Sequence, residues 1–146
     1  MKRFFLSLVL LIALGFGAQF YFAKQELAPI KVLSCADITQ SCGNAMFTVQ
    51  FAEAPQVMKQ LHLNLHMHQA EAVKSIHVDF AMQNMEMGLN RYRLIQASQS
   101  GDWQAEVTLP ICVQGRSDWS MLLEIESGEK IQRFQLPFSA KANRAN

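Results

Sequence analysis

The sequence lacks an excess of charge of either sign. Its 146 residues include 13 Lys plus Arg and 12 Asp plus Glu, which gives a formal net charge of +1. A protein that binds the phosphate backbone of nucleic acid usually carries a basic patch, and an acidic interaction tail needs a run of carboxylates. Neither is present, so we expect no nucleic acid partner. The length is that of a single folded domain.

The common signatures of enzyme active sites are also missing. The chain contains no Gly-x-Ser-x-Gly, no glycine-rich phosphate loop and no His-Glu-x-x-His. Carboxylates near turns usually cap the backbone or face solvent. Four aspartates lie in separate segments without an obvious partner: Asp37, Asp79, Asp102 and Asp118. Because no nucleophile and base can be paired from these segments, we expect a protein that is not an enzyme.

One long hydrophobic run stands near the N-terminus. Residues 4–23 carry no charge and follow two basic residues, and this length lets an α-helix cross the hydrocarbon core. Positive charge before the run places the N-terminus in the cytoplasm. We predict a transmembrane signal-anchor over residues 1–23, single-pass in the inner (cytoplasmic) membrane, with the rest of the chain in the periplasm. The alternative is a cleaved signal peptide, with Gly15 and Gly17 as the small residues before the cleavage site.

Cysteine is scarce, and its spacing does not form a redox motif. Cys35, Cys42 and Cys112 include no Cys-x-x-Cys, which disfavours a thioredoxin-like activity. Outside the cytoplasm, one disulfide and one remaining thiol is the simplest arrangement. Cys35 and Cys42 enclose a short polar loop and are the nearest pair, whereas Cys112 would join either of them to the sheet. The sequence leaves this choice open. Charged residues between the apolar run and Cys35 disfavour a lipid-modified cysteine there.

Apolar and polar residues alternate along most of the chain after residue 44. A period of two indicates half-buried strands, and Trp103 and Trp119 fall on the inward side of this pattern. The alternation predicts seven short strands, around Phe47–Phe51, Leu61–Met67, Ile76–Met82, Tyr92–Leu94, Trp103–Leu109, Trp119–Ile125 and Phe134–Phe138.

Turn signals separate several of these strands, among them Gly101 and Gly128 with their polar neighbours. Such spacing favours an antiparallel β-sandwich, and we predict a mainly β fold with immunoglobulin-like topology. The expected organisation is the signal-anchor, an irregular linker with the cysteine pair over residues 24–44, the β-sandwich domain over 45–140 and a tail over 141–146.

Methionine is abundant, and three of the eight fall between two predicted strands, at Met82, Met85 and Met87. Thioether sulfur is a soft ligand that selects Cu(I), so closely spaced methionines indicate a copper site in an exported protein. Methionine is also a common filler of hydrophobic cores. In that interpretation Met82 ends a core-facing stripe and the other two pack under the loop.

Three histidines add a second candidate metal site. If the chain turns back tightly after residue 69, the register that pairs the apolar positions places His66 opposite His77 on the outward face, with His68 nearby. Cross-strand Cβ atoms in such a pair lie about 5 Å apart, close enough to share a metal ion. Solvent-facing imidazoles without a ligand are the simpler alternative.

The segments Phe80–Gly88, which reads FAMQNMEMG, and Trp103–Pro110, which ends in Thr-Leu-Pro, resemble the FixH and YtkA-like families. Those families are membrane-anchored, immunoglobulin-like exported domains associated with copper handling and the assembly of respiratory oxidases. The resemblance implies a copper role for Met82, Met85 and Met87, and respiratory-oxidase assembly proteins as partners. The present chain departs from the pattern in its N-terminal cysteine pair and in Cys112.

Three hypotheses about function follow. The first is a membrane-tethered, non-catalytic module that handles copper, as Cu(I), or assists assembly of a copper-containing respiratory enzyme. The second is a metal-free interaction module of a membrane complex. The third, a thiol-dependent oxidoreductase that uses Cys112, is ranked last because no resolving cysteine is evident.

Overall fold

The computed structural model describes residues 28–69, 73–82, 85, 88–111 and 116–141. The predicted signal-anchor and nearly all of the predicted tail lie outside the described residues, as do Met87 and Cys112. Among the residues described, no helix is long and apolar enough to cross a membrane.

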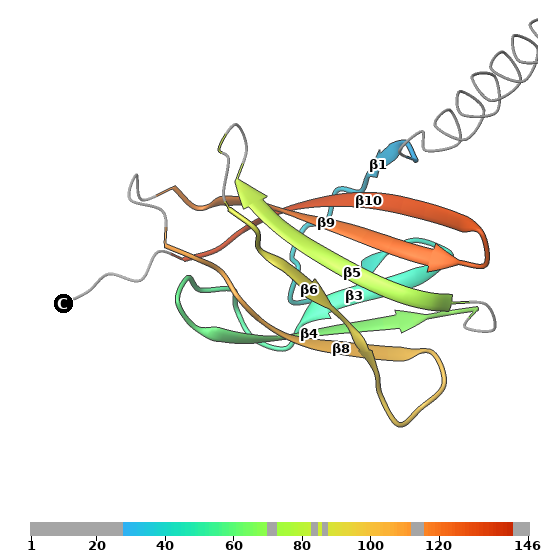
Figure 1. Cartoon of the computed structure of the whole chain (residues 1–146). Helices are drawn as coiled ribbons and strands as arrows, with labels where there is room; N and C mark the ends of the chain where they lie inside the picture. The colour runs from blue at the N-terminus through green and yellow to red at the C-terminus, as the bar shows by residue number, and fades with distance from the viewer. Residues whose placement is uncertain (1–27, 70–72, 83–84, 86–87, 112–115, 142–146) are drawn as a thin grey trace, which may run out of the picture.

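The described chain is mainly β and forms two sheets (Figure 1). The first sheet has the order β1-β10-β9-β5-β6 and the second β2-β3-β4-β8-β7. All neighbours are antiparallel except β1 and β10. The seven predicted strands are confirmed, and three very short ones join them. The bounds are β1 Ile30–Val32, β2 Cys42–Gly43, β3 Phe47–Phe51, β4 Gln60–Met67, β5 Val73–Met82, β6 Arg91–Arg93, β7 Ile95–Gln96, β8 Asp102–Thr108, β9 Asp118–Ser127 and β10 Lys130–Ser139.

The two sheets pack face to face over one hydrophobic core. Buried and exposed residues alternate along β4, as a strand with one face on a core requires. Phe51 of β3 contacts Phe80 and Phe138 of the other sheet, with ring centroids 6.1 and 5.5 Å apart. Trp103 and Trp119 are 7% and 1% exposed, so the prediction that both are packing residues is confirmed.

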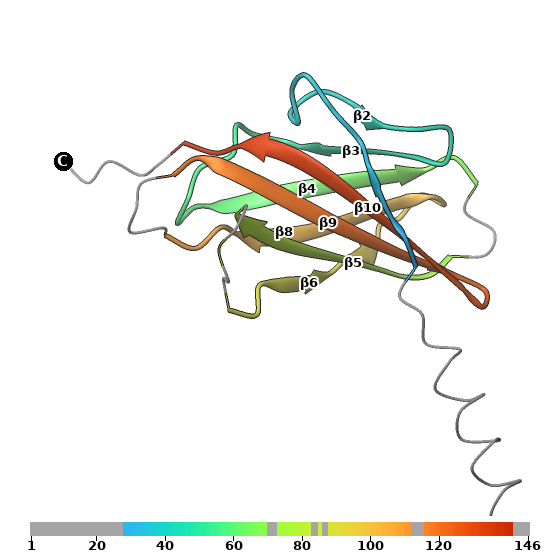
Figure 2. The same cartoon turned by 90° about the horizontal axis from the view of Figure 1, so that it is seen from above.

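The segment between the two N-terminal strands crosses from one sheet to the other. β1 pairs with β10 in the first sheet, and β2 pairs with β3 in the second (Figure 2). A disulfide between Cys35 and Cys42 closes this crossover, and Ile38 within it is buried in the core. Of the pairings that the sequence left open, the structure therefore contains the one between the two nearest cysteines. The prediction of an irregular linker missed both strands, because strands of two or three residues carry no readable period.

The predicted hairpin between β4 and β5 is wrong. β4 pairs with β3 and β8, whereas β5 pairs with β9 and β6 in the other sheet. The chain therefore changes sheets after β4 rather than turning back beside it. His66 and His77 both have outward parity, but they face solvent on opposite sides of the sandwich.

Candidate functional site

The outer face of β4 carries a row of polar side chains at every second position. His66 lies on this face because its neighbours Leu65 and Met67 point into the core. The N–H of His68 donates to the carbonyl of Met46 at 2.9 Å, which continues the β3–β4 ladder one residue beyond the end of β4. His68 is thus held in extended geometry two residues from His66, and both side chains are exposed on the same face.

Asp102 fixes the orientation of one of these imidazoles. It is the cross-strand partner of His66 on β8, and its Oδ1 lies 2.5 Å from His66 Nδ1. A carboxylate that accepts from Nδ1–H selects the tautomer in which Nε2 keeps its lone pair. The same carboxylate–histidine arrangement orients metal-binding imidazoles in many proteins. His66 is therefore prepared to act as a ligand through Nε2.

The two imidazoles are spaced as they would be around one metal ion. The ring centroids of His66 and His68 lie 5.4 Å apart, with 67° between the ring planes. An imidazole nitrogen binds Zn²⁺ at about 2.0–2.1 Å, and the ring centre lies roughly 1.2 Å further out, so two imidazoles on a tetrahedral ion have centroids about 5 Å apart. The observed centroid distance of 5.4 Å matches that expected for two imidazoles on one ion.

The surroundings of the pair are polar and open. A shallow hollow of about 410 Å³ lies beside His66, lined by Ser41, Thr48, Gln50, Asn64, Leu65, His66, Ala97, Asp102, Trp103 and Gln104. Over the part of the chain that the structure describes, no group of three or more His, Cys, Asp or Glu side chains is arranged to hold a metal ion. A metal ion at this pair would therefore have two protein ligands from it, and water or another molecule would fill the other coordination positions.

His62 lies on the same face of β4 as His66, and carboxylates face it on both sides. Its Nδ1 lies 3.3 Å from Glu53 and its Nε2 lies 3.8 Å from Glu106. Its two ring nitrogens thus lie near acidic side chains, four residues before His66 along the strand.

His77 does not belong to this site. Its cross-strand neighbours in the first sheet are Glu124 and Arg93. The same outer face carries an ion-pair network in which Arg91 donates to Asp79 at 2.8 Å and to Glu124 at 2.7 Å. The hydrogen bond with Glu124 and the charges of both carboxylates raise the pKa of Arg91 despite partial burial. The positive charge of Arg91 is therefore balanced by two neighbouring carboxylates on this face.

Met82, the last residue of β5, and Met85, in the segment after β5, both contact the core. Met82 is 3% exposed, and Met85 is half-buried and packs against the same core. The two residues form an isolated β-bridge, in which the N–H of Met85 donates to the carbonyl of Met82 at 3.4 Å. Met82 is thus positioned as a packing residue rather than as a ligand open to solvent.

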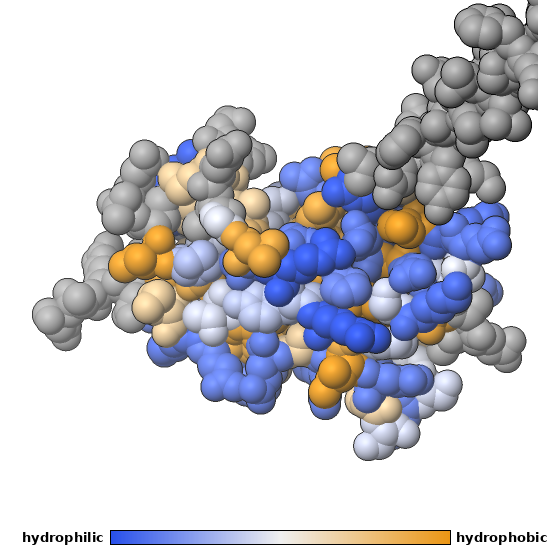
Figure 3. All heavy atoms as spheres, viewed as in Figure 1, coloured by the Kyte–Doolittle hydropathy of each residue, from blue (hydrophilic) through white to orange (hydrophobic). Residues whose placement is uncertain are grey.

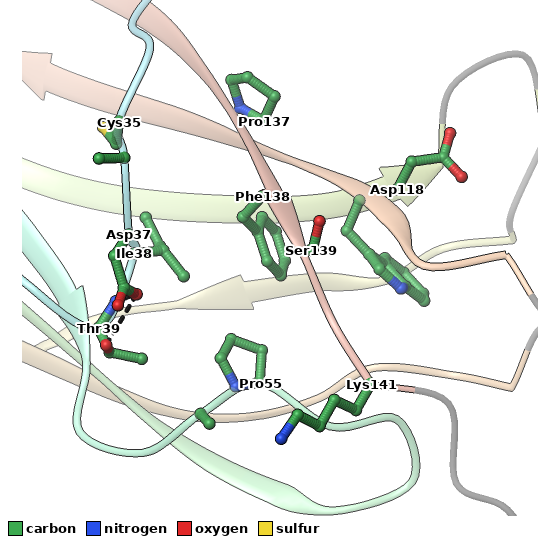
Figure 4. Close-up of a pocket in the computed structure, with 13 residues that line it drawn as sticks. Cys35, Asp37, Ile38, Thr39, Pro55, Asp118, Pro137, Phe138, Ser139 and Lys141 are labelled. Carbon is green, nitrogen blue, oxygen red and sulfur yellow. Dashed lines mark hydrogen bonds between the residues drawn. The ribbon is translucent and has the colours of Figure 1, made fainter.

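A second, larger cleft lies under the disulfide-closed crossover (Figure 4). Its volume is about 510 Å³, and its lining includes Asp37, Asp118 and Lys141. Asp37 accepts from the N–H and hydroxyl of Thr39 at 2.9 and 2.8 Å, and these hydrogen bonds lower its pKa. Asp118 is paired with Arg116, which lowers its pKa as well. Figure 4 shows Asp37 and Asp118 on opposite sides of the cleft, so they do not form a paired acid and base.

Sequence reasoning selected His66 and His68 but missed Asp102. The aspartate was interpreted as a turn residue without a partner, because the pairing of β4 with β8 was not recognised. Matching the apolar stripe of β4 to that of β8 would have provided the only signal, since Leu65 pairs with Trp103 and Leu61 with Val107.

Comparison with known proteins adds no family assignment. The similarity to the FixH and YtkA-like families therefore remains a prediction that rests on residues 80–88 and 103–110. No family model matches this chain, and no curated protein matches it in sequence.

Proposed function

We propose that the protein is a membrane-tethered, non-catalytic module outside the cytoplasm that handles copper or assists assembly of a copper-containing respiratory enzyme. The observation that carries the proposal is the His66–His68 pair, with His66 oriented by Asp102. Imidazole is a good ligand for copper, and a two-histidine site with open positions suits an ion that is passed on. Respiratory-oxidase assembly proteins would be the receiving partners.

The methionine loop would be a separate site for the reduced ion. β4 ends and β5 begins at one end of the sandwich, whereas Met85 follows β5 at the other end. The ten residues of β5 span roughly 30 Å at the rise of a strand, so one ion cannot bridge the two sets. Imidazoles would take Cu(II) or Cu(I), and the thioethers of Met85 and Met87 would take Cu(I).

The proposal also includes an immunoglobulin-like topology for the β-sandwich and a signal-anchor at the N-terminus. The orders β3-β4-β8-β7 and β10-β9-β5-β6 support the former, because they match strands A-B-E-D and G-F-C-C′ of that fold. The uncharged run over residues 4–23 supports an anchor in the cytoplasmic membrane.

A metal-free interaction module is the second candidate, favoured by apolar side chains at the end of the sandwich that carries Met85. Leu89 is 96% exposed, and Ile111 and Met58 are 61% and 57% exposed. The N–H of Met58 donates to the carbonyl of Leu109, so the loops before β4 and after β8 lie together there. Such a group of exposed apolar residues suits a protein partner.

The deciding experiment is copper titration of the full chain in detergent, against a competing chromophoric chelator. Cu(II) is titrated without reductant and Cu(I) with ascorbate. We expect the double variant His66→Gln, His68→Gln to weaken Cu(II) binding at least tenfold, because both ligands are lost. His77→Gln is the matched control and should bind as the wild type does. Absence of copper binding in both oxidation states would reject the metal proposal and leave the interaction module.

A further inference from the structure

Three exposed aliphatic side chains lie together at one edge of the first sheet. Ile30 and Val32 of β1 are 45% and 65% exposed, and Ile131 of β10 is 49% exposed. Ile30 pairs with Arg133 and Val32 with Gln135, so both share the outer face of the sheet with Ile131, which has the same parity as Arg133. Figure 3 shows hydrophobic side chains over this part of the surface.

From this arrangement we propose that the outer face of β1 and β10 rests on the lipid surface of the membrane. The inference rests on the anchor proposed above. Six residues lie between the end of the apolar run at residue 23 and Ile30, and the seven Cα–Cα steps across them reach at most about 25 Å when fully extended. The linker therefore keeps the patch within about 25 Å of the end of the anchor, close enough for it to reach the bilayer.

Because the proposed anchor tethers the domain to the membrane, a patch of three aliphatic side chains is enough to hold this face against the lipid surface. Three aliphatic side chains would give only weak membrane binding to a free domain. The anchor and its short linker raise the effective concentration of these side chains at the lipid surface. Their binding to lipid then becomes the second, intramolecular step of one binding process.

The orientation has a consequence for the candidate metal site. His66 and His68 lie on the outer face of the second sheet, on the opposite side of the sandwich from Ile30 and Ile131. With the β1–β10 face against lipid, the histidine pair is turned away from the membrane and remains open to a partner in the compartment.

Brominated lipids test this contact because they quench only tryptophans that reach the acyl region. The full chain is reconstituted in phosphatidylcholine vesicles, with and without bromine on the acyl chains. The variants are Ile131→Trp and Ile30→Trp, with Ile95→Trp as the matched control, since Ile95 is 60% exposed in the other sheet. The wild-type signal from the buried Trp103 and Trp119 is subtracted. Vesicle flotation reports separately whether the chain is anchored.

We expect at least twofold quenching of the added tryptophan in Ile131→Trp and Ile30→Trp, and none in Ile95→Trp. Flotation without quenching of either patch variant would overturn the membrane contact while leaving the anchor intact. A blue-shifted but unquenched emission would assign the patch to a protein contact instead and would also overturn it. Loss of flotation would overturn the anchor and, with it, this orientation.

Discussion

The phenol of Tyr92 is hydrogen-bonded to both backbone groups of Thr108, which belongs to the opposite sheet. The hydroxyl donates to the carbonyl at 2.9 Å and accepts from the N–H at 3.1 Å. β7 pairs with β8 only at Gln104 and Trp103, so it does not reach the end of β8. Tyr92 takes the place of a neighbouring strand at that end and ties the two sheets together along an edge that would otherwise be open.

Replacing Tyr92 by Phe removes both hydrogen bonds and keeps the ring, which packs edge-on against Phe80. We expect the free energy of unfolding to fall by about 1–2 kcal/mol, since two hydrogen bonds are lost at a partly solvated edge. Urea unfolding followed by tryptophan fluorescence measures this change. Thr108→Val is the control, because the two hydrogen bonds use the backbone of Thr108 and not its side chain. If Thr108→Val lowered the free energy of unfolding as much as Tyr92→Phe does, the loss in Tyr92→Phe could not be assigned to the hydrogen bonds of the phenol.

The disulfide between Cys35 and Cys42 joins the ends of the crossover. Its residues are seven apart in sequence, with Cα atoms 5.7 Å from each other. Closing a loop of this size stabilises a protein by about 2 kcal/mol in the chain-entropy account. The double variant Cys35→Ala, Cys42→Ala should lower the unfolding midpoint accordingly and make it insensitive to reductant. Cys112→Ser should keep the reductant sensitivity of the wild type; its loss would mean that Cys112 takes part in the bridge.

The alternation of apolar residues predicted the face of each strand but not its sheet. Leu63 and Phe80 both point into the core, and that holds equally for partners in one hairpin and for strands on opposite sides of a sandwich. The hairpin prediction failed for this reason. Sheet membership depends on long-range pairing, such as that of β5 with β9, which local periodicity does not contain.

For the candidate metal site, too, the sequence predicted which residues share a face of one strand, but not which residues of distant strands lie beside them. His66 and His68 lie two residues apart on one strand, so local geometry alone places them on one face. Asp102 reaches His66 from 36 residues away, and His77 is removed to the opposite face by the change of sheet after β4. The position of Asp102 beside His66 and the position of His77 on the opposite face both depend on the pairing of strands that are distant in the sequence.

Asp37 gives the crossover a defined dependence on pH. Hydrogen bonds from the backbone and side chain of Thr39 lower the pKa of this carboxyl below its ordinary value of 3.8. A lowered folded-state pKa contributes stability that is present above the unfolded pKa and is lost as the pH falls through the folded pKa. The stability difference between the wild type and Asp37→Asn should therefore be constant above about pH 5 and shrink towards pH 2. Urea unfolding at several pH values measures this difference, and a gap that widens in acid would contradict it.

The role of Asp102 in orienting His66 gives the sharpest test of the candidate metal site. Asp102→Asn keeps the size of the side chain and its place on β8, but it replaces the carboxylate that accepts from His66 Nδ1. Loss of such a partner typically lowers metal affinity by about 10–100-fold without removing a ligand. We expect a drop of this size in Cu(II) affinity, with the free energy of unfolding nearly unchanged because both side chains are partly exposed to solvent, where an ion pair contributes little.

The matched control is Asp118→Asn, which breaks the pairing with Arg116 at a site away from the histidines. Its Cu(II) affinity should equal that of the wild type. If Asp102→Asn also binds as the wild type does while His66→Gln does not, then His66 is a ligand that needs no orienting carboxylate. If neither variant changes the affinity, copper is held elsewhere, and the spacing of the two imidazoles reflects only their neighbouring places on one strand.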